Sequence, residues 1–162
     1  MVGSHLILVL EERIFSMLPG EDIAKLKEQI ERDGLSLAEL DAIVCRLKLP
    51  HPVSSITTER YHASAMTVDS FRALIIDGLA TPNTGLVLNF DGALLPNNYK
   101  VDVGHHSPIV AYHSERDLVL LADVWPTCPI AWHYVKELWK ATNSIDFDSN
   151  QHRGLLKIVI DK

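Results

Sequence analysis

Two residues in the second half of the chain have the types and spacing of a catalytic base and the group that orients it. His105 lies at the beginning of the segment Gly104-His105-His106-Ser107-Pro108-Ile109, and Asp123 lies in the next apolar segment, Leu121-Ala122-Asp123-Val124. A thiol nucleophile needs a neighbouring imidazole to take its proton, and the imidazole needs a third group to fix its tautomer. Because one hairpin separates the two residues, they can face each other on adjacent strands. The pattern predicts a base with its orienting carboxylate, and a structural His–Asp pair is the alternative.

Neither of the two cysteines is well placed to be the thiol nucleophile. Cys45 is expected near the C-terminal end of a helix, where the macrodipole disfavours a thiolate. It lies beside the apolar stripe of that helix, which predicts a small core residue. Cys128 lies between two prolines and follows the histidine in the chain. Two cysteines do not make a disulfide framework, so we expect a reducing compartment.

A metal site is a second interpretation of the histidine-rich segment. The imidazoles of His105, His106 and His113 could join Asp123 as ligands, and imidazole suits zinc or copper. However, neighbouring residues in a strand point to opposite faces, so His105 and His106 cannot both line one pocket once the strand has begun. The chain also has no paired-cysteine spacing and no His-Glu-x-x-His motif. We therefore predict no metal site.

Hydrophobic periodicity predicts helices mainly in the first half of the chain and strands mainly in the second. The expected helices cover 6–18 (with a strand over 6–10 as the alternative), 21–33, 37–47, a segment capped by Thr67, and 132–141. The expected strands cover 86–90, 106–112, 117–124 and 155–160, with a short strand between 54 and 66. We expect Trp132, Tyr134 and Trp139 in the core or against helices. The order of elements predicts an α+β fold, with helices packed on a largely antiparallel, twisted sheet.

The composition is that of a single ordinary globular domain over residues 1–162. The chain carries a net charge of −6, and this acidic balance argues against nucleic-acid binding. The apolar run 6–10 is too short to span a bilayer and lacks the flanks of a signal peptide. We therefore expect no membrane partner and a cytoplasmic location.

Many short segments of the chain resemble the catalytic domain of phytochelatin synthases, the glutathione γ-glutamylcysteinyltransferases with a papain-like cysteine-peptidase fold. The matching segments are 34–40, 68–72, 104–108, 111–112, 117–124, 138–141, 144–146 and 153–154. They keep the order and spacing of the family from about residue 30 to residue 160. The resemblance implies a papain-like α+β fold, in which 34–162 corresponds to most of the catalytic domain and 1–33 to a truncated helical part.

The resemblance also implies roles for three residues. His105 matches the general base of the family, Asp123 its orienting carboxylate, and Arg153 a basic residue near the substrate site. A cation at that place could pair with a carboxylate of glutathione. Without the resemblance, a surface ion pair is the alternative for Arg153. The family implies no cofactor of the protein itself, because its activity depends on metal–glutathione complexes.

The chain departs from the family pattern at the nucleophile. The family has a cysteine preceded by a glutamine, whereas here no cysteine precedes Cys45 and Gln29 is the only glutamine before it. The family's arginine-aromatic-lysine-tyrosine run after the Asp-Val pair is replaced by Trp125-Pro126-Thr127-Cys128-Pro129. One hypothesis is therefore an impaired transferase or hydrolase acting on the Cys–Gly bond of glutathione. The other is a pseudoenzyme or fragment that binds a glutathione-like peptide or a protein partner, whose exposed apolar surface predicts a homo-oligomer.

Overall fold

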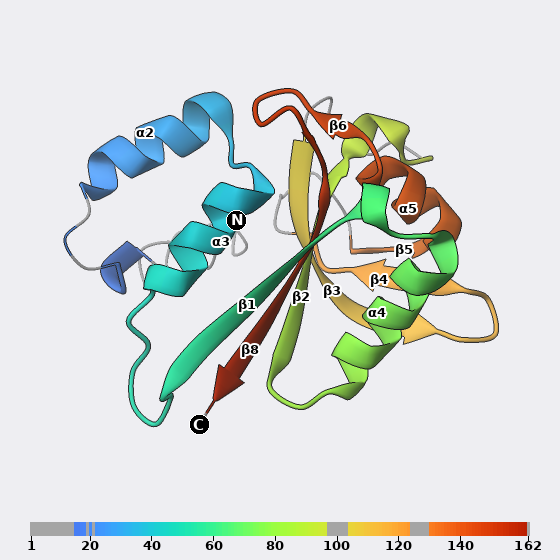
Figure 1. The fold of residues 1–162 in the computed structure, drawn as a ribbon, viewed down its shortest axis with the longest axis horizontal. Helices are drawn as coiled ribbons and strands as arrows, with labels where there is room; N and C mark the ends of the chain where they lie inside the picture. The colour runs from blue at the N-terminus through green and yellow to red at the C-terminus, as the bar shows by residue number, and fades with distance from the viewer. Residues whose placement is uncertain (1–14, 19, 21, 97–103, 124–129, 162) are drawn as a thin grey trace.

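An antiparallel sheet forms the centre of the structure (Figure 1). The computed structural model describes residues 15–18, 20, 22–96, 104–123 and 130–161. Within these residues, six strands pair in the order β1-β8-β2-β3-β4-β5, and each neighbouring pair is antiparallel. The strands are β1 Ser55–His62, β2 Thr84–Asp91, β3 Gly104–His113, β4 Leu118–Leu121, β5 Ala131–Tyr134 and β8 Gly154–Asp161. A separate ribbon pairs β6 (Ile145–Asp146) with β7 (Gln151–His152).

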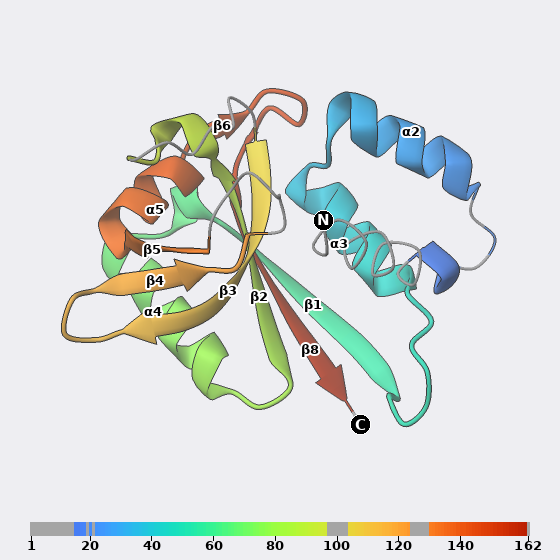
Figure 2. The same cartoon turned by 180° about the vertical axis from the view of Figure 1, so that it is seen from behind.

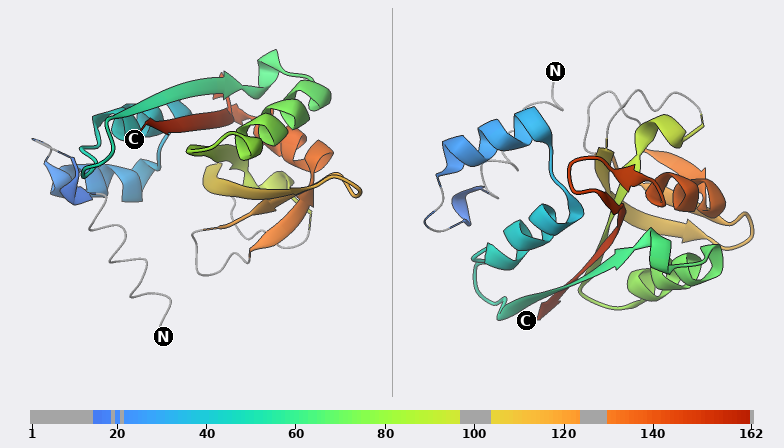
Figure 3. Two further views of the ribbon diagram at one scale, coloured as in Figure 1. Left: turned by 90° about the horizontal axis from the view of Figure 1, so that it is seen from below. Right: turned by 45° about the horizontal axis from the view of Figure 1, so that its top comes forward.

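Helices cover both faces of the sheet (Figures 1 and 2). On one face, α4 (Val68–Ala80) packs on β2 and β3, and α5 (Val135–Thr142) packs on β2 and β5. On the other face, α3 (Leu37–Arg46) packs on β1 and β8, with α2 (Ile23–Asp33) beside it. Figure 3 shows the twisted sheet curving around α4 and α5. The structure thus confirms the α+β fold predicted from the sequence.

The main core lies between the sheet and helices α4 and α5. Phe71, Ile75 and Leu138 reach it from the helices, and Leu155 reaches it from β8. Burying each of these side chains stabilises the fold by about 1.5–3 kcal/mol. Leu156 is also fully buried, on the face of β8 turned toward α3. A strand that is covered on both faces can carry consecutive apolar residues, as β8 does.

Capping side chains fix the beginnings of α3 and α4. Glu39 N–H donates to Ser36 Oγ at 3.3 Å, and Ser36 N–H donates to Glu39 Oε2 at 2.8 Å, as the capping-box pattern predicts. Thr67 and Ser70 form the same reciprocal pair at α4. The positive φ of Gly34, 73°, lets the chain turn away directly after α2.

The segment predicted as one helix over 132–141 divides into a strand and a helix. Residues 131–134 pair with β4 as the edge strand β5, and α5 begins only at Val135. Trp132 and Tyr134 are 45% and 56% exposed, so their prediction as core residues is wrong. They project from the outer face of the sheet, whereas their neighbour His133 projects inward. Trp139 does pack against the main core, as predicted.

Other differences concern the length and number of strands. The strand expected between 54 and 66 is longer than predicted, because β1 pairs with β8 along its whole length. The β6–β7 ribbon was not predicted. Most of the expected helix 6–18, and also Val124 and Cys128, lie outside the described residues. None of the described helices is long and apolar enough to cross a membrane.

Candidate active site

His105 and Asp123 come together at one end of the sheet. His105 lies in β3 opposite Phe90 of β2, and Asp123 closely follows β4, whose Leu121 pairs with Ile109 of β3. This antiparallel register brings Asp123 alongside the beginning of β3. His105 Nε2 lies 2.9 Å from both Oδ1 and Oδ2 of Asp123. The two residues that the sequence pairs are therefore in hydrogen-bond contact.

Both side chains are shielded from water. The His105 side chain is 6% exposed, and the Asp123 side chain is 0% exposed. The Phe90 ring meets the His105 imidazole edge to face, with ring centroids 5.6 Å apart. In such a poorly solvated place, a hydrogen bond to a carboxylate is stronger than in water. A carboxylate that accepts from Nε2–H also fixes which nitrogen of the imidazole carries the proton.

Ser107 makes a contact in this site that was not predicted. Its hydroxyl donates to Asp123 Oδ2 at 2.8 Å, and the residue is fully buried. Ser107 lies two residues after His105 in β3, and alternate residues of a strand share a face. That spacing is the sequence signal that could have identified it.

His106 belongs to the opposite face of β3, because the strand has already begun at Gly104. Its Nε2 lies 2.6 Å from Asn89 Nδ2. Burial lowers the pKa of His106 to about 4, with smaller electrostatic contributions from His105 and from the Arg153 guanidinium. Among the described residues, no group of three or more His, Cys, Asp or Glu side chains could hold a metal ion.

Arg153 is buried, so the surface ion pair considered from the sequence is wrong. The residue is 6% exposed, and its Nη1 donates to Asp146 Oδ1 at 2.9 Å and to Asn89 Oδ1 at 3.3 Å. Asp146 also accepts a hydrogen bond from Ser149 Oγ at 2.6 Å. The pair is buried because the β6–β7 ribbon carries Asp146 over the end of the sheet. A polar network therefore links Asp146, Arg153, Asn89 and His106.

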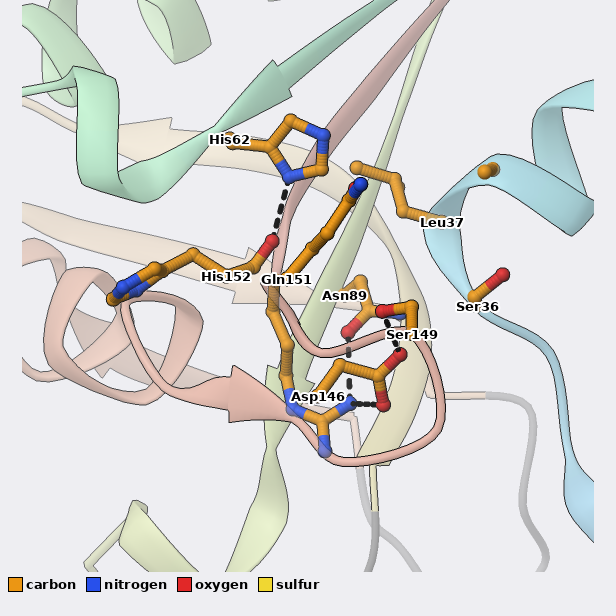
Figure 4. Close-up of a pocket in the computed structure, with 10 residues that line it drawn as sticks. Ser36, Leu37, His62, Asn89, Asp146, Ser149, Gln151 and His152 are labelled. Atoms are coloured by element: carbon orange, nitrogen blue, oxygen red, sulfur yellow. Dashed lines mark hydrogen bonds and ion pairs between the residues drawn. The ribbon is translucent and has the colours of Figure 1, made fainter.

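A narrow hollow lies beside this network (Figure 4). It is lined by Ser36, Leu37, Ala38, His62, Asn89, Asp146, Ser149, Gln151, His152 and Arg153. In Figure 4, Asp146, Ser149 and Asn89 gather on one side, and the beginning of α3 forms the other. Asn89 and Phe90 are neighbours in β2, so this hollow and His105 lie on opposite faces of the sheet.

Cys45 lies at the C-terminal end of α3 and is exposed, so its prediction as a core residue is wrong. Its Sγ lies 3.1 Å from Thr58 Oγ1 and 3.5 Å from Asp41 Oδ1. Thr58 is level with Gly85 at the beginning of β2, whereas His105 is level with Phe90 at its other end, with β8 and β2 between β1 and β3. From the spacing of strands and of residues along them, Thr58, the residue that Cys45 contacts, lies about 20 Å from His105.

Comparison with known proteins gives consistent matches over most of the chain. Residues 11–155 match the family model described as Phytochelatin synthase. Glutathione gamma-glutamylcysteinyltransferase 2 of Arabidopsis thaliana is 30% identical over 132 residues, which are 81% of this chain and 27% of that protein. Glutathione gamma-glutamylcysteinyltransferase 1 of the same plant is 29% identical over 138 residues, 85% of this chain and 26% of that protein. Glutathione gamma-glutamylcysteinyltransferase 3 of Lotus japonicus is 29% identical over 138 residues. The chain thus spans about a quarter of the length of these relatives.

Proposed function

This chain belongs to the phytochelatin synthase family, which has a papain-like α+β fold, and we propose that it serves acyl transfer from glutathione or a related γ-glutamyl peptide. This acyl transfer would break the Cys–Gly amide bond, release glycine, and pass the γ-glutamylcysteinyl group to a second glutathione or to water. The names of the relatives described above identify them as transferases of the γ-glutamylcysteinyl group. The observation that carries the proposal is the buried contact of His105 Nε2 with the Asp123 carboxylate at 2.9 Å.

In this proposal His105 moves protons, and Asp123 holds the imidazole. Asp123 accepts from Nε2–H, so a thiol proton would pass to Nδ1. The thiolate would form an S–C bond to the cysteinyl carbonyl carbon of glutathione. The imidazolium would then return its proton to the glycine nitrogen as the C–N bond breaks. An amine or water would finally attack the thioester, with His105 again as the base. We assign no nucleophilic thiol to the described residues.

A second candidate function is that of a binding relative without the covalent step. It is favoured by the position of Cys45, which contacts Asp41 and Thr58, since Thr58 lies about 20 Å from His105 by strand spacing. In this case the chain would bind a glutathione-like peptide or a protein partner, and the His105–Asp123 contact would be structural.

The experiment that separates the two is glycine release from glutathione by the purified protein, with and without cadmium. Acyl transfer predicts release that His105→Ala abolishes, Asp123→Asn lowers, and Cys45→Ala leaves unchanged. His113→Ala is the matched control, since this histidine lies at the far end of β3 and meets the ring of Trp132 on the outer face. Without release under any condition, the acyl-transfer function is wrong, and glutathione binding then tests the second candidate.

Four finer expectations stay predictions. They are the metal response, the cytoplasmic location, the homo-oligomer, and the contact of Arg153 with a glutathione carboxylate. Arg153 Nη1 already pairs with Asp146, so such a contact would use another guanidinium nitrogen or displace Asp146. The Arg153→Lys variant tests it, because lysine keeps the charge but loses the planar fork. A raised KM for glutathione with unchanged protein stability would support a direct contact.

A further inference from the structure

We infer that Ser107 is a positioning residue, which holds the Asp123 carboxylate in one orientation and thereby selects the tautomer of His105. This inference rests on the proposed role of His105 and deepens it. The contact that carries it is the hydrogen bond from Ser107 Oγ to Asp123 Oδ2 at 2.8 Å. Ser107 does not act on the substrate; it acts on the imidazole through Asp123.

The backbone places these three side chains together. His105 and Ser107 alternate along β3 and so project to the same face, and the β3–β4 register returns Asp123 to that face. The Asp123 side chain is 0% exposed and Ser107 is 0% exposed, so protein donors must take the place of water around the carboxylate. A carboxylate has about four acceptor positions on its two oxygens, which leaves room for more than one donor.

The hydroxyl limits rotation of the carboxylate. His105 Nε2 lies 2.9 Å from both Oδ1 and Oδ2 of Asp123. This contact alone therefore does not fix the orientation of the carboxylate. Ser107 distinguishes them, since it bonds Oδ2. With the carboxylate plane held, Nε2–H is the favoured form of His105, and Nδ1 is the nitrogen that would take a proton. Without the hydroxyl, the carboxylate can turn out of line with Nε2–H. The hydrogen bond that favours this tautomer then lengthens, and the preference for Nε2–H weakens.

The test is the tautomer of His105, measured by 15N NMR on histidine-labelled protein. The His105→Gln variant identifies its signals. We expect the Nε2–H form in the wild type, a shift toward mixed tautomers in Ser107→Ala, and a larger shift in Asp123→Asn. Ser107→Thr keeps the hydroxyl and restores the wild-type signals. Ser144→Ala is the matched control, because Ser144 Oγ donates to Ala141 O, outside this site.

The outcome does not depend on whether the protein turns over glutathione. If Ser107→Ala leaves the His105 signals as in the wild type, the inference is overturned. Ser107→Cys covers the case in which the alanine variant does not fold, since it keeps a side chain of similar size with a weak donor. If the wild type releases glycine, we also expect Ser107→Ala to lower kcat about tenfold, the effect of one hydrogen bond to a charged group, with KM unchanged. A protein that releases no glycine but shows the tautomer shift would contradict the proposed function and support the role of Ser107.

Discussion

The guanidinium of Arg153 lies against the backbone of Gly104, the residue before His105. A Cβ at Gly104 would come within 2.2 Å of Arg153 Nη1 and 2.7 Å of Cζ. The same Nη1 is held by Asp146 and Asn89, so the guanidinium has little freedom to move away. Gly104 does not adopt a positive φ, so glycine is needed here for space. The side chain of Arg153, which lies between β7 and β8, therefore packs against the beginning of β3.

We expect Gly104→Ala to lower the free energy of unfolding by about 1–3 kcal/mol, the usual effect of forcing an extra carbon into a packed place. Gly85→Ala is the matched control, because Gly85 also lies in a strand and has nothing within 4 Å of its Cβ position. Urea denaturation of both variants measures the effect. Equal stabilities would show that Arg153 moves aside freely.

The buried ion pair gives a second prediction. Arg153→Met leaves the Asp146 carboxylate buried without its cation, which we expect to cost about 3–5 kcal/mol of stability. Adding Asp146→Asn to Arg153→Met should recover part of this loss, because it removes the uncompensated charge. A double-mutant cycle by urea denaturation measures the coupling. Additive single effects would contradict the pairing as an energetic unit.

The helices were predictable where the sequence carries local signals. Ser36 and Thr67 cap α3 and α4, and Gly34 follows α2, so those three helices were expected close to their observed places. The α5 helix lacks such a signal, since no side chain caps it at Tyr134. The strand β5 runs into it without a loop, which is why 132–141 was expected to be a single helix. β1 was expected to be short because its exposed polar residues weaken the alternation of apolar side chains.

Only the part of the candidate site that lies within one hairpin could be predicted from the sequence. His105 and Asp123 lie in recognisable segments, and a single hairpin joins them. The positions of Asp146 and Asn89 around Arg153 depend on how β2, β8 and the β6–β7 ribbon meet, which no local pattern gives. Cys45 was expected in the core because it follows Val44 at the edge of the apolar stripe. In the structure Ile43 is buried, whereas Cys45 is exposed.

Acid should weaken the ion pair between α4 and the turn before β4. The Arg72 guanidinium, helped by the Tyr112 hydroxyl, holds the pKa of Asp117 below its usual range. The unfolded chain therefore binds this proton more readily than the folded one, so the stabilisation is present above about pH 4 and lost as the pH falls further. Asp117→Asn should lose less stability on acidification, and asparagine tolerates the φ of 53° there. Asp69→Asn is the comparison, since that carboxylate also pairs with Arg72 Nη1 but is 90% exposed.

The carboxamide of Asn89 lies between Arg153 and His106 and is oriented by the cation. Its oxygen accepts from Arg153 Nη1, so its NH2 group faces His106 Nε2 at 2.6 Å. Because that NH2 can only donate, Nε2 must accept and cannot carry a proton. Protonation of His106 would therefore break this contact and add a positive charge beside Arg153.

We predict that stability falls as the pH decreases from about 6.5 to about 4, in part because of His106. Burial and the electrostatic influence of His105 and Arg153 lower its pKa, so in this window the unfolded chain binds a proton that the folded chain does not. The contribution is at most one proton, about 1.4 kcal/mol per pH unit. His106→Gln should flatten the dependence measured by urea denaturation at several pH values, whereas His113→Gln should not. Parallel curves for the wild type and His106→Gln would show that Asn89 can turn to receive the protonated ring.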